Sequence, residues 1–103
     1  MIARTWHGRV PSDKTDAYDS FLQTVALPDY KDTKGNRGVM MLRRTEDGVT
    51  HYVLTTLWDS IEAIKRFAGE DYERARYYPQ DDGFLLEKEP LVVHHEVLYS
   101  DCA

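Results

Sequence analysis

The side chains best suited to proton chemistry gather in the C-terminal third of the chain. His94 and His95 are adjacent within the β-forming run LVVHHEVLY, and an imidazole titrates close to neutral pH. Successive strand residues point to opposite faces, so only one of the two can face a given cavity and act there as a general base. Tyr77 and Tyr78 each carry a hydroxyl that could donate a hydrogen bond to a substrate oxygen, as could Tyr18 or Tyr52. We therefore take His94, His95 and Tyr78 as catalytic candidates, and hydrogen-bonded structural roles as the alternative.

The elements that position these groups follow from the periodicity of apolar residues. Alternating patterns predict four strands, over Ile2–Val10, Val39–Thr45, Val49–Trp58 and Leu91–Tyr99. Helical spacing predicts a first helix from about Asp13 to Leu27, which Pro28 ends or kinks. The Asp47-Gly48 pair between the second and third strands is typical of a hairpin turn.

A second helix should start directly after Trp58. Asp59 is expected as its N-cap, with Glu62 returning the bond from the third helical position, and Gly69 should end it. Trp58 and the apolar side of this helix are then expected to share a core. A further helical segment is predicted from Asp71 to Tyr78, with an ion pair between Glu70 and Arg74 and a stop at Pro79; Gln80–Pro90 should be a loop.

The order strand-helix-strand-strand-helix-strand predicts an α+β domain, in which a four-stranded antiparallel sheet carries its helices on one face. The other face is also apolar, because Met40 and Leu42 alternate with Val39 and Met41 along the second strand. A sheet that faces water on one side normally has a polar second face. We therefore expect a second copy of the chain to cover it across a two-fold axis.

Composition limits the remaining choices. The 103 residues suit a single domain, with residues 1–99 as its core and 100–103 as a tail. A net charge of −5 argues against nucleic acid as a partner, and no apolar run approaches a membrane span. The N-terminus carries no signal-peptide hydrophobic region, so a cytoplasmic location is the default. Cys102 is the single cysteine and is expected to be an exposed tail thiol.

Several short stretches of the chain together resemble a known family. Leu57-Trp58-Asp59-Ser60 and the following Glu62-Ala63-Ile64, Phe67-Ala68-Gly69, Tyr77-Tyr78-Pro79 and His94-His95-Glu96-Val97 together resemble the dimeric α/β-barrel superfamily, and within it the antibiotic biosynthesis monooxygenase (ABM)-like domains. The similarity covers essentially the whole chain. It implies a ferredoxin-like protomer that pairs sheet to sheet with its mate, and a ligand cavity between sheet and helices.

The resemblance implies a small-molecule-binding homodimer that needs no cofactor and could oxidise an aromatic or polyketide-like substrate. Trp58 resembles the tryptophan that lines the cavity of quinone-forming members and could stack on a planar ligand, the alternative being that it fills the core. Trp6, Tyr77 and Arg76 are further candidates for substrate binding. The alternative function is a non-catalytic dimeric domain that binds a ligand or takes part in a stress response.

Two departures from the quinone-forming pattern matter. Those members carry a polar amide four residues before the tryptophan, where this chain has Leu54. They also carry an arginine near the end of the second helical segment, which only Arg74 or Arg76 could supply here.

The haem-degrading branch is matched less well. It has an asparagine on the first strand, where this chain offers Thr5 or His7, and a tryptophan on the second helix, where it offers Phe67. Its axial histidine corresponds to Arg76 or Tyr77.

Metal binding is not predicted. In the implied sheet His7 lies near the last strand, so that only one of His94 and His95 can share its face, while His51 should lie at the far end of the third strand. Two histidines fall short of the three protein ligands of a catalytic zinc site. The remaining carboxylates of the second half are expected to form a solvated acidic face: Glu70, Asp71, Glu73, Asp81 and Asp82.

Overall fold

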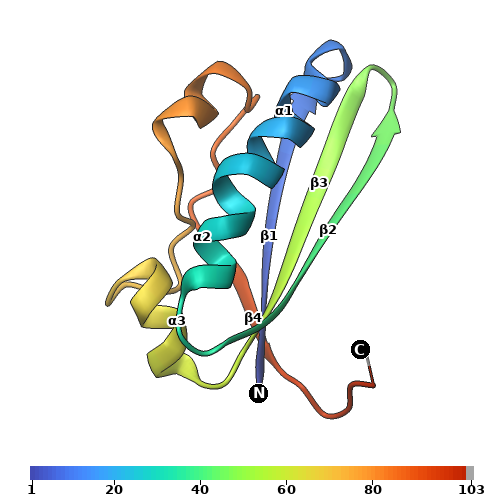
Figure 1. The fold of residues 1–103 in the computed structure, drawn as a ribbon. Coiled ribbons are helices and arrows are strands. Elements are labelled where there is room, and N and C mark those ends of the chain that lie inside the picture. Colours follow the sequence, from blue (N-terminus) through green and yellow to red (C-terminus); the bar gives the residue numbers. More distant parts are fainter. Residues whose placement is uncertain (102–103) are drawn as a thin grey trace.

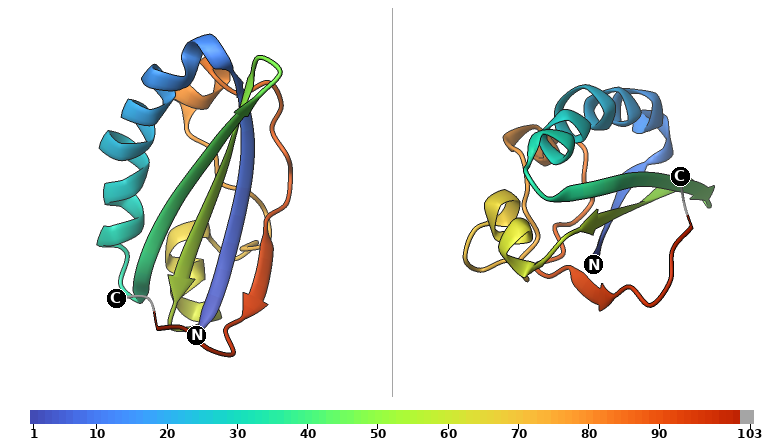
Figure 2. Two further views of the ribbon diagram at one scale, coloured as in Figure 1. Left: turned by 90° about the vertical axis from the view of Figure 1, so that its right-hand side faces the viewer. Right: turned by 60° about the horizontal axis from the view of Figure 1, so that its bottom comes forward.

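A computed structural model describes residues 1–101, so the tail thiol of Cys102 lies outside the described residues. Its centre is one antiparallel sheet in the order β2-β3-β1-β4, and the helices lie together on one face of that sheet (Figures 1 and 2). The strands are β1 (Ile2–Pro11), β2 (Asn36–Glu46), β3 (Val49–Trp58) and β4 (Val93–Glu96). The α+β ferredoxin-like arrangement expected from the sequence is confirmed. Among residues 1–101, no helix is long and apolar enough to cross a membrane.

The turn between β2 and β3 agrees with expectation, whereas the last strand does not. β2 and β3 join through Asp47 and Gly48, whose φ angles of 52° and 77° are those of the tight turn that an Asp-Gly pair predicts. The predicted strand over Leu91–Tyr99 is too long, because β4 pairs with β1 only opposite Ile2–Thr5. Beyond it β1 has ended, and the side chain of Leu98 is 97% exposed.

The first helical region is longer than predicted. After a 3₁₀ turn (Ser12–Lys14), α1 (Thr15–Phe21), a π-helical turn (Leu22–Ala26) and α2 (Leu27–Asp32) follow one another without a break. The predicted end at Leu27 is therefore wrong. Pro28 falls in the first turn of α2, where a missing amide hydrogen costs least, and the wider π-helical turn directly precedes it.

The helix after β3, α3 (Ile61–Ala68), has a different cap from the expected one. The Ser60 hydroxyl accepts the Ala63 amide at 3.2 Å, whereas the Asp59 carboxylate pairs with Arg37. Asp59 as N-cap is therefore wrong by one residue. Gly69 ends the helix with φ of 88°, as its residue type predicts.

No helix forms over residues 71–78, which corrects the prediction for that segment. The backbone of residues 73–75 pairs instead with residues 90–92, through Val92 N to Glu73 O and Ala75 N to Pro90 O, both at 2.9 Å. The predicted Glu70–Arg74 ion pair is also absent from the described residues, because Arg74 pairs with Asp71 at 2.9 Å. Pro79 opens a 3₁₀ turn, η3 (Pro79–Gly83), within the stretch expected to be irregular.

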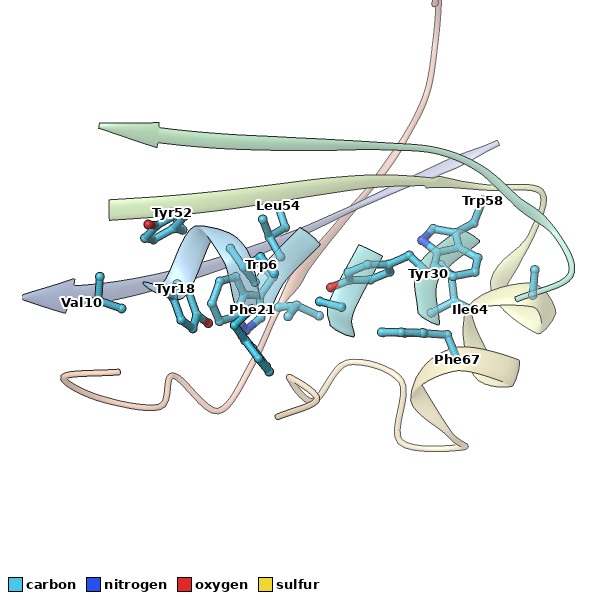
Figure 3. Packing of buried hydrophobic residues seen from close by; sticks show 14 residues of the cluster. Trp6, Val10, Tyr18, Phe21, Tyr30, Tyr52, Leu54, Trp58, Ile64 and Phe67 are labelled. Atoms are coloured by element: carbon cyan, nitrogen blue, oxygen red, sulfur yellow. The ribbon is translucent and has the colours of Figure 1, made fainter. Parts of the chain in front are cut away.

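The core lies between the sheet and the helices (Figure 3). Even-numbered residues of β1 and β3 point toward the helices, among them Trp6 and Trp58. Trp58 is fully buried, packs 5.7 Å from the ring of Phe67 on α3, and donates its indole N–H to Thr56 at 2.8 Å. The shared core of Trp58 and the following helix is thus confirmed.

Candidate functional site

A small cavity lies between the sheet and the α1–α2 region, under the segment that follows α3. Its volume is about 10 Å³, room for about one water molecule. Aromatic and polar side chains line it together: Trp6, Tyr18, Phe21, Leu22, Ala26, Tyr30, Leu54, Arg76, Tyr78 and Asp81. This is the position at which the resemblance places a ligand cavity, but here the side chains fill it.

Three parts of the chain supply the lining. Trp6 and Leu54 are direct cross-strand partners on the covered face of the sheet. Tyr18 and Phe21 are three residues apart on α1 and therefore share one side of the helix. Arg76 comes from the irregular segment after α3. The cavity is thus closed by a loop rather than by regular structure.

Asp81 is the most deeply buried carboxylate of the described residues, at 2% exposure. It accepts the Tyr18 hydroxyl and the Tyr78 amide, each at 2.8 Å. Burial, and next the negative charge of Asp81, raise the pKa of Tyr18, so the phenol stays protonated and donates. Asp81 was predicted to lie on a solvated face, which is wrong because the 3₁₀ turn after Pro79 directs it inward as a cap.

Arg76, Asp29 and Tyr78 form a second hydrogen-bonded cluster at the cavity. The Arg76 guanidinium lies 2.8 Å from Asp29 and donates to the Phe67 carbonyl at 3.2 Å. The Tyr78 hydroxyl donates to the same Asp29 oxygen at 2.6 Å, and burial raises its pKa. Of the two arginines that the sequence left open, Arg76 lines the cavity, while Arg74 lies on the surface beside Asp71.

Tyr30 adds a third hydroxyl to the site. Its ring stacks on Phe67 at 4.5 Å, and its oxygen points toward the Trp6 side of the cavity, away from Trp58 (Figure 3). Burial raises the pKa of Tyr30 to about 12, against the opposing effect of the Arg4 and Arg76 guanidinium groups. The hydroxyl is therefore protonated at neutral pH and can donate to a ligand oxygen.

The structure brings some of the predicted site residues together and separates others. Trp6, Arg76 and Tyr78 line the cavity, whereas Trp58 is enclosed in the core beside α3 and does not. Tyr77 lies on the other side of Trp6, edge-on at 6.2 Å, and its hydroxyl donates to the Glu89 carbonyl at 2.5 Å.

The two neighbouring histidines lie on opposite faces of β4, as strand geometry requires. His94 is on the helix-covered face opposite Arg4, with its ring edge-on to Tyr72 at 5.2 Å and its Nε2 without a hydrogen-bond partner. Burial, and next the charge of Arg4, lower the pKa of His94. His95 is exposed on the open face beside Ala3. Neither imidazole lines the cavity.

The other two histidines meet on the open face. His51 was expected far from the remaining histidines, yet its ring stacks on His7 at 5.4 Å, with His7 Nε2 3.2 Å from His51 Nδ1. His7 Nδ1 contacts the Glu89 carboxylate. The three groups form a chain rather than a convergent set, and residues 1–101 contain no group of three acidic, histidine or cysteine side chains that could hold a metal ion.

Of the tyrosines named as possible donors to a substrate oxygen, Tyr18 lines the cavity and Tyr52 does not. Sequence reasoning missed Phe21, Tyr30 and Asp81 as site residues. For Phe21 a signal existed in the helical spacing, which identified a buried helix side but not a cavity. Tyr30 was hidden because the helix was expected to end before it. Asp81 could have been found only from the capping pattern in which its side chain accepts the Tyr78 amide.

Comparison with known proteins supports the fold. No protein family profile matches the chain, and no curated protein sequence matches it. Among solved structures, a manganese-porphyrin complex of a variant of MhuD covers 100% of both chains, with a TM-score of 0.68 and 17% identity. An antibiotic biosynthesis monooxygenase, so assigned, from Nitrosomonas europaea covers 96% of this chain and 100% of its own, with a TM-score of 0.67 and 19% identity.

A third similar structure is the haem degrader MhuD from Mycobacterium tuberculosis with two haems bound in its active site. It has a TM-score of 0.65 and 18% identity, over 97% of this chain and 98% of its own. The ABM-like fold inferred from the sequence is confirmed. At identities below 20%, these likenesses concern the fold and leave the chemistry to the residues of this chain.

Proposed function

We propose that this protein is a homodimer that binds a flat aromatic or polyketide-like small molecule in the cavity between its sheet and α1–α2. The observation that carries the proposal is that Trp6 and Phe21 line one cavity together with Arg76 and the phenols of Tyr30 and Tyr78. Aromatic walls with a few fixed polar groups are typical of small-molecule sites. The same fold holds planar ligands in MhuD.

Ligand entry requires the cover of the cavity to move. A volume of about 10 Å³ cannot hold an aromatic ring. The cover runs from Arg76 to Pro90, and its only regular element is the 3₁₀ turn η3. The Leu86 amide in this segment donates a hydrogen bond to the Arg9 carbonyl at 2.9 Å. Outward movement of Tyr78 with this segment would open the space above Trp6.

The chemistry proposed for the bound ligand is oxidation by molecular oxygen without a cofactor. A phenol ring bearing a hydrogen opposite its hydroxyl reacts with one O₂ to give a quinone and one water, so the substrate supplies all four electrons. The reaction starts from a phenolate, whose negative charge the Arg76 guanidinium would stabilise. Leu54 occupies the place of the amide found in quinone-forming proteins, so Arg76, Tyr30 and Tyr78 must supply the polar contacts.

A matched pair of arginines tests this proposal. Calorimetry would measure the binding of naphthols and hydroxylated anthracenes to the wild type, to Arg76→Gln and to Arg74→Gln. We expect binding that weakens at least about tenfold in Arg76→Gln, the loss of a charged hydrogen bond. Arg74 lies on the surface, so Arg74→Gln should bind the ligands as tightly as the wild type does. Absence of binding to the wild type across the panel would contradict the proposal.

Oxygen consumption with the same panel separates the two functional alternatives. Oxygen uptake above the buffer rate, reduced in Arg76→Gln, would support the monooxygenase. If the wild type binds ligand but oxygen uptake stays at the buffer rate in the wild type, Arg76→Gln and Arg74→Gln, the result would support the alternative of a non-catalytic ligand-binding or stress-associated domain. Tyr78→Phe tests the proposed catalytic role of that hydroxyl in the same assay, and His94→Ala and His95→Ala test the two imidazoles.

The homodimer is proposed from the open face of the sheet. Met40 and Leu42 of β2 are each 47% exposed, and they lie beside Val53 and Leu57 of β3 on the side without helices. The face continues to Val93 of β4. Burying such a surface against a second copy removes apolar area from water, which an open sheet cannot do alone.

A further inference from the structure

Arg4 is a buried cation without a counter-charge. It lies on the covered face of β1 at 1% exposure. Its Nη2 donates to the Arg74 carbonyl at 3.1 Å, and its Nε has no hydrogen-bond partner. Within residues 1–101, no carboxylate forms an ion pair with it.

Such a group is costly to keep in the core. A charge removed from water without a partner destabilises the folded state, and a guanidinium cannot escape the cost by losing its proton at neutral pH. Burial is the main influence on the pKa of Arg4, which it lowers; Tyr30 opposes this effect, and the nearby charge of Arg76 acts in the same direction as burial. An arginine under these conditions requires either a functional reason or a ligand that supplies the missing charge.

The surroundings of Arg4 connect it to the cavity. Its guanidinium carbon lies 5.5 Å from the centre of the Phe67 ring, and that of Arg76 lies 4.7 Å from the same ring. Tyr30 stacks on Phe67 at 4.5 Å. Since Tyr30 and Arg76 line the cavity, the ring of Phe67 connects Arg4 to two of its lining residues.

The charges around Phe67 do not balance. Asp29 lies 2.8 Å from Arg76 and offsets its charge. Within the described part of the chain, the positive charge of Arg4 is then not offset by a negative charge, and the Nε–H of the same guanidinium has no hydrogen-bond partner. The Tyr30 hydroxyl, kept protonated by burial, adds a neutral donor on the cavity side.

We propose that the natural ligand of this cavity carries a carboxylate on its aromatic body, and that Arg4, with Arg76 and Tyr30, binds that carboxylate. The proposal rests on the proposed function, because the aromatic body occupies the space at Trp6 and Phe21. A planar guanidinium matches a carboxylate with two parallel hydrogen bonds. The single negative charge of a carboxylate neutralises the single unpaired positive charge, whereas a phosphate dianion would leave one negative charge buried.

The first part of the test measures the protein without ligand. Arg4→Met removes the charge and keeps a long apolar side chain, and Arg4→Gln removes the charge but keeps a donor for the Arg74 carbonyl. If Arg4 is held for a ligand, both variants should be at least as stable as the wild type in thermal unfolding. If Arg4 serves only to hold the Arg74 carbonyl, Arg4→Met should be clearly less stable, which would overturn the proposal.

The second part compares three probes: 2-naphthoate, the neutral 2-naphthamide, and acetate. By calorimetry at neutral pH, the wild type should bind 2-naphthoate about tenfold to a hundredfold more tightly than 2-naphthamide, the size of a charged hydrogen-bond contribution. In Arg4→Gln this preference should disappear. Arg37→Gln is the matched control, because Arg37 is exposed and its guanidinium pairs with Asp59, and it should keep the preference.

The outcomes distinguish this proposal from the proposed function. Equal binding of 2-naphthoate and 2-naphthamide to the wild type would contradict the proposal that the ligand carries a carboxylate. It would remain consistent with an aromatic ligand in the cavity. Stabilisation of the wild type by acetate but not by equimolar chloride, absent in Arg4→Gln and without binding of either naphthalene, would support the anion site and contradict the aromatic ligand. If none of the three probes binds, the carboxylate proposal fails; if the naphthols and hydroxylated anthracenes also fail to bind, the proposed function fails with it.

Discussion

At the residue scale, Asp81 is the side chain on which the geometry of the site depends. It fixes Tyr18 from the α1 side and the Tyr78 amide from the cover, and so joins two walls of the cavity. Asp81→Asn should destabilise the fold by about 1–3 kcal/mol, because an amide cannot accept both bonds with its two terminal atoms. Urea unfolding measures the change.

Asp82 provides the control for that prediction. It is the neighbouring residue in the same 3₁₀ turn but is exposed, with its carboxylate beside Lys88. Asp82→Asn should change stability by less than about 1 kcal/mol, as expected for a surface ion pair. Equal effects of the two substitutions would contradict the buried role of Asp81.

His94 makes stability depend on pH at the same scale. Burial, and then the charges of Arg4 and His95, lower the pKa of His94 in the folded state, with Glu73 opposing them. The unfolded chain therefore binds the proton more readily, so stability should be full above the unfolded pKa of about 6.5 and decline as pH falls from about 7 to 5. Thermal unfolding across this range should show a shallower decline for His94→Gln than for the wild type.

His95→Gln separates this effect from a general change of charge. Its imidazole lies on the open face, so the variant keeps the half-buried imidazole of His94 and should keep most of the wild-type slope, losing only the part that the His95 charge contributes. Asp59, whose pKa is lowered by its hydrogen bond to Arg37, titrates below the window and does not interfere. A His94→Gln slope equal to that of the wild type would show that His94 is not the titrating group.

At the element scale, the start of α3 offers a direct test of which side chain caps it. Ser60→Ala should cost about 1 kcal/mol in urea unfolding, the typical value for a lost N-cap. Asp59→Ala removes only the surface pair with Arg37 and should cost less. The reverse order would restore Asp59 as the cap.

Local sequence predicted those elements whose signals are themselves local. The strand alternation, the Asp47-Gly48 turn and the glycine after α3 all act within a few residues of one another, and the structure contains each of them. The segment after α3 could not be predicted in this way, because its conformation depends on backbone pairing between residues 73–75 and 90–92. Helical spacing alone cannot reveal such a non-local competitor.

The same reason explains what was predictable about the site. Tyr78 was predicted from its residue type, and Trp6 and Arg76 from the resemblance, but that all three line one cavity depends on the tertiary fold. Trp58 was named from resemblance, but in this chain Phe67 and Ile64 of α3 enclose it together with the sheet. Arg4 was not predicted as a site residue, although it has the same parity on β1 as Trp6 and Val10, because residue type alone favours an exposed arginine.

At the scale of the whole molecule, the proposed dimer depends on the open face of the sheet. Leu42→Lys places a charge in the apolar surface of the open face and should convert the proposed dimer into a monomer. Light scattering at micromolar concentration should give twice the 12.0 kDa chain mass for the wild type and the chain mass for the variant. A wild-type mass of 12.0 kDa would contradict the paired sheets.

The most direct test of the ligand cavity uses the two indole N–H signals in a ¹⁵N NMR titration with 2-naphthol. Trp6 lines the cavity and its Nε1 has no hydrogen-bond partner, whereas Trp58 is enclosed and donates to Thr56. We predict that the Trp6 signal shifts with saturation while the Trp58 signal changes little. A titration that leaves Trp6 unmoved, or that moves residues of the open face such as Leu42 instead, would contradict a binding site between sheet and helices.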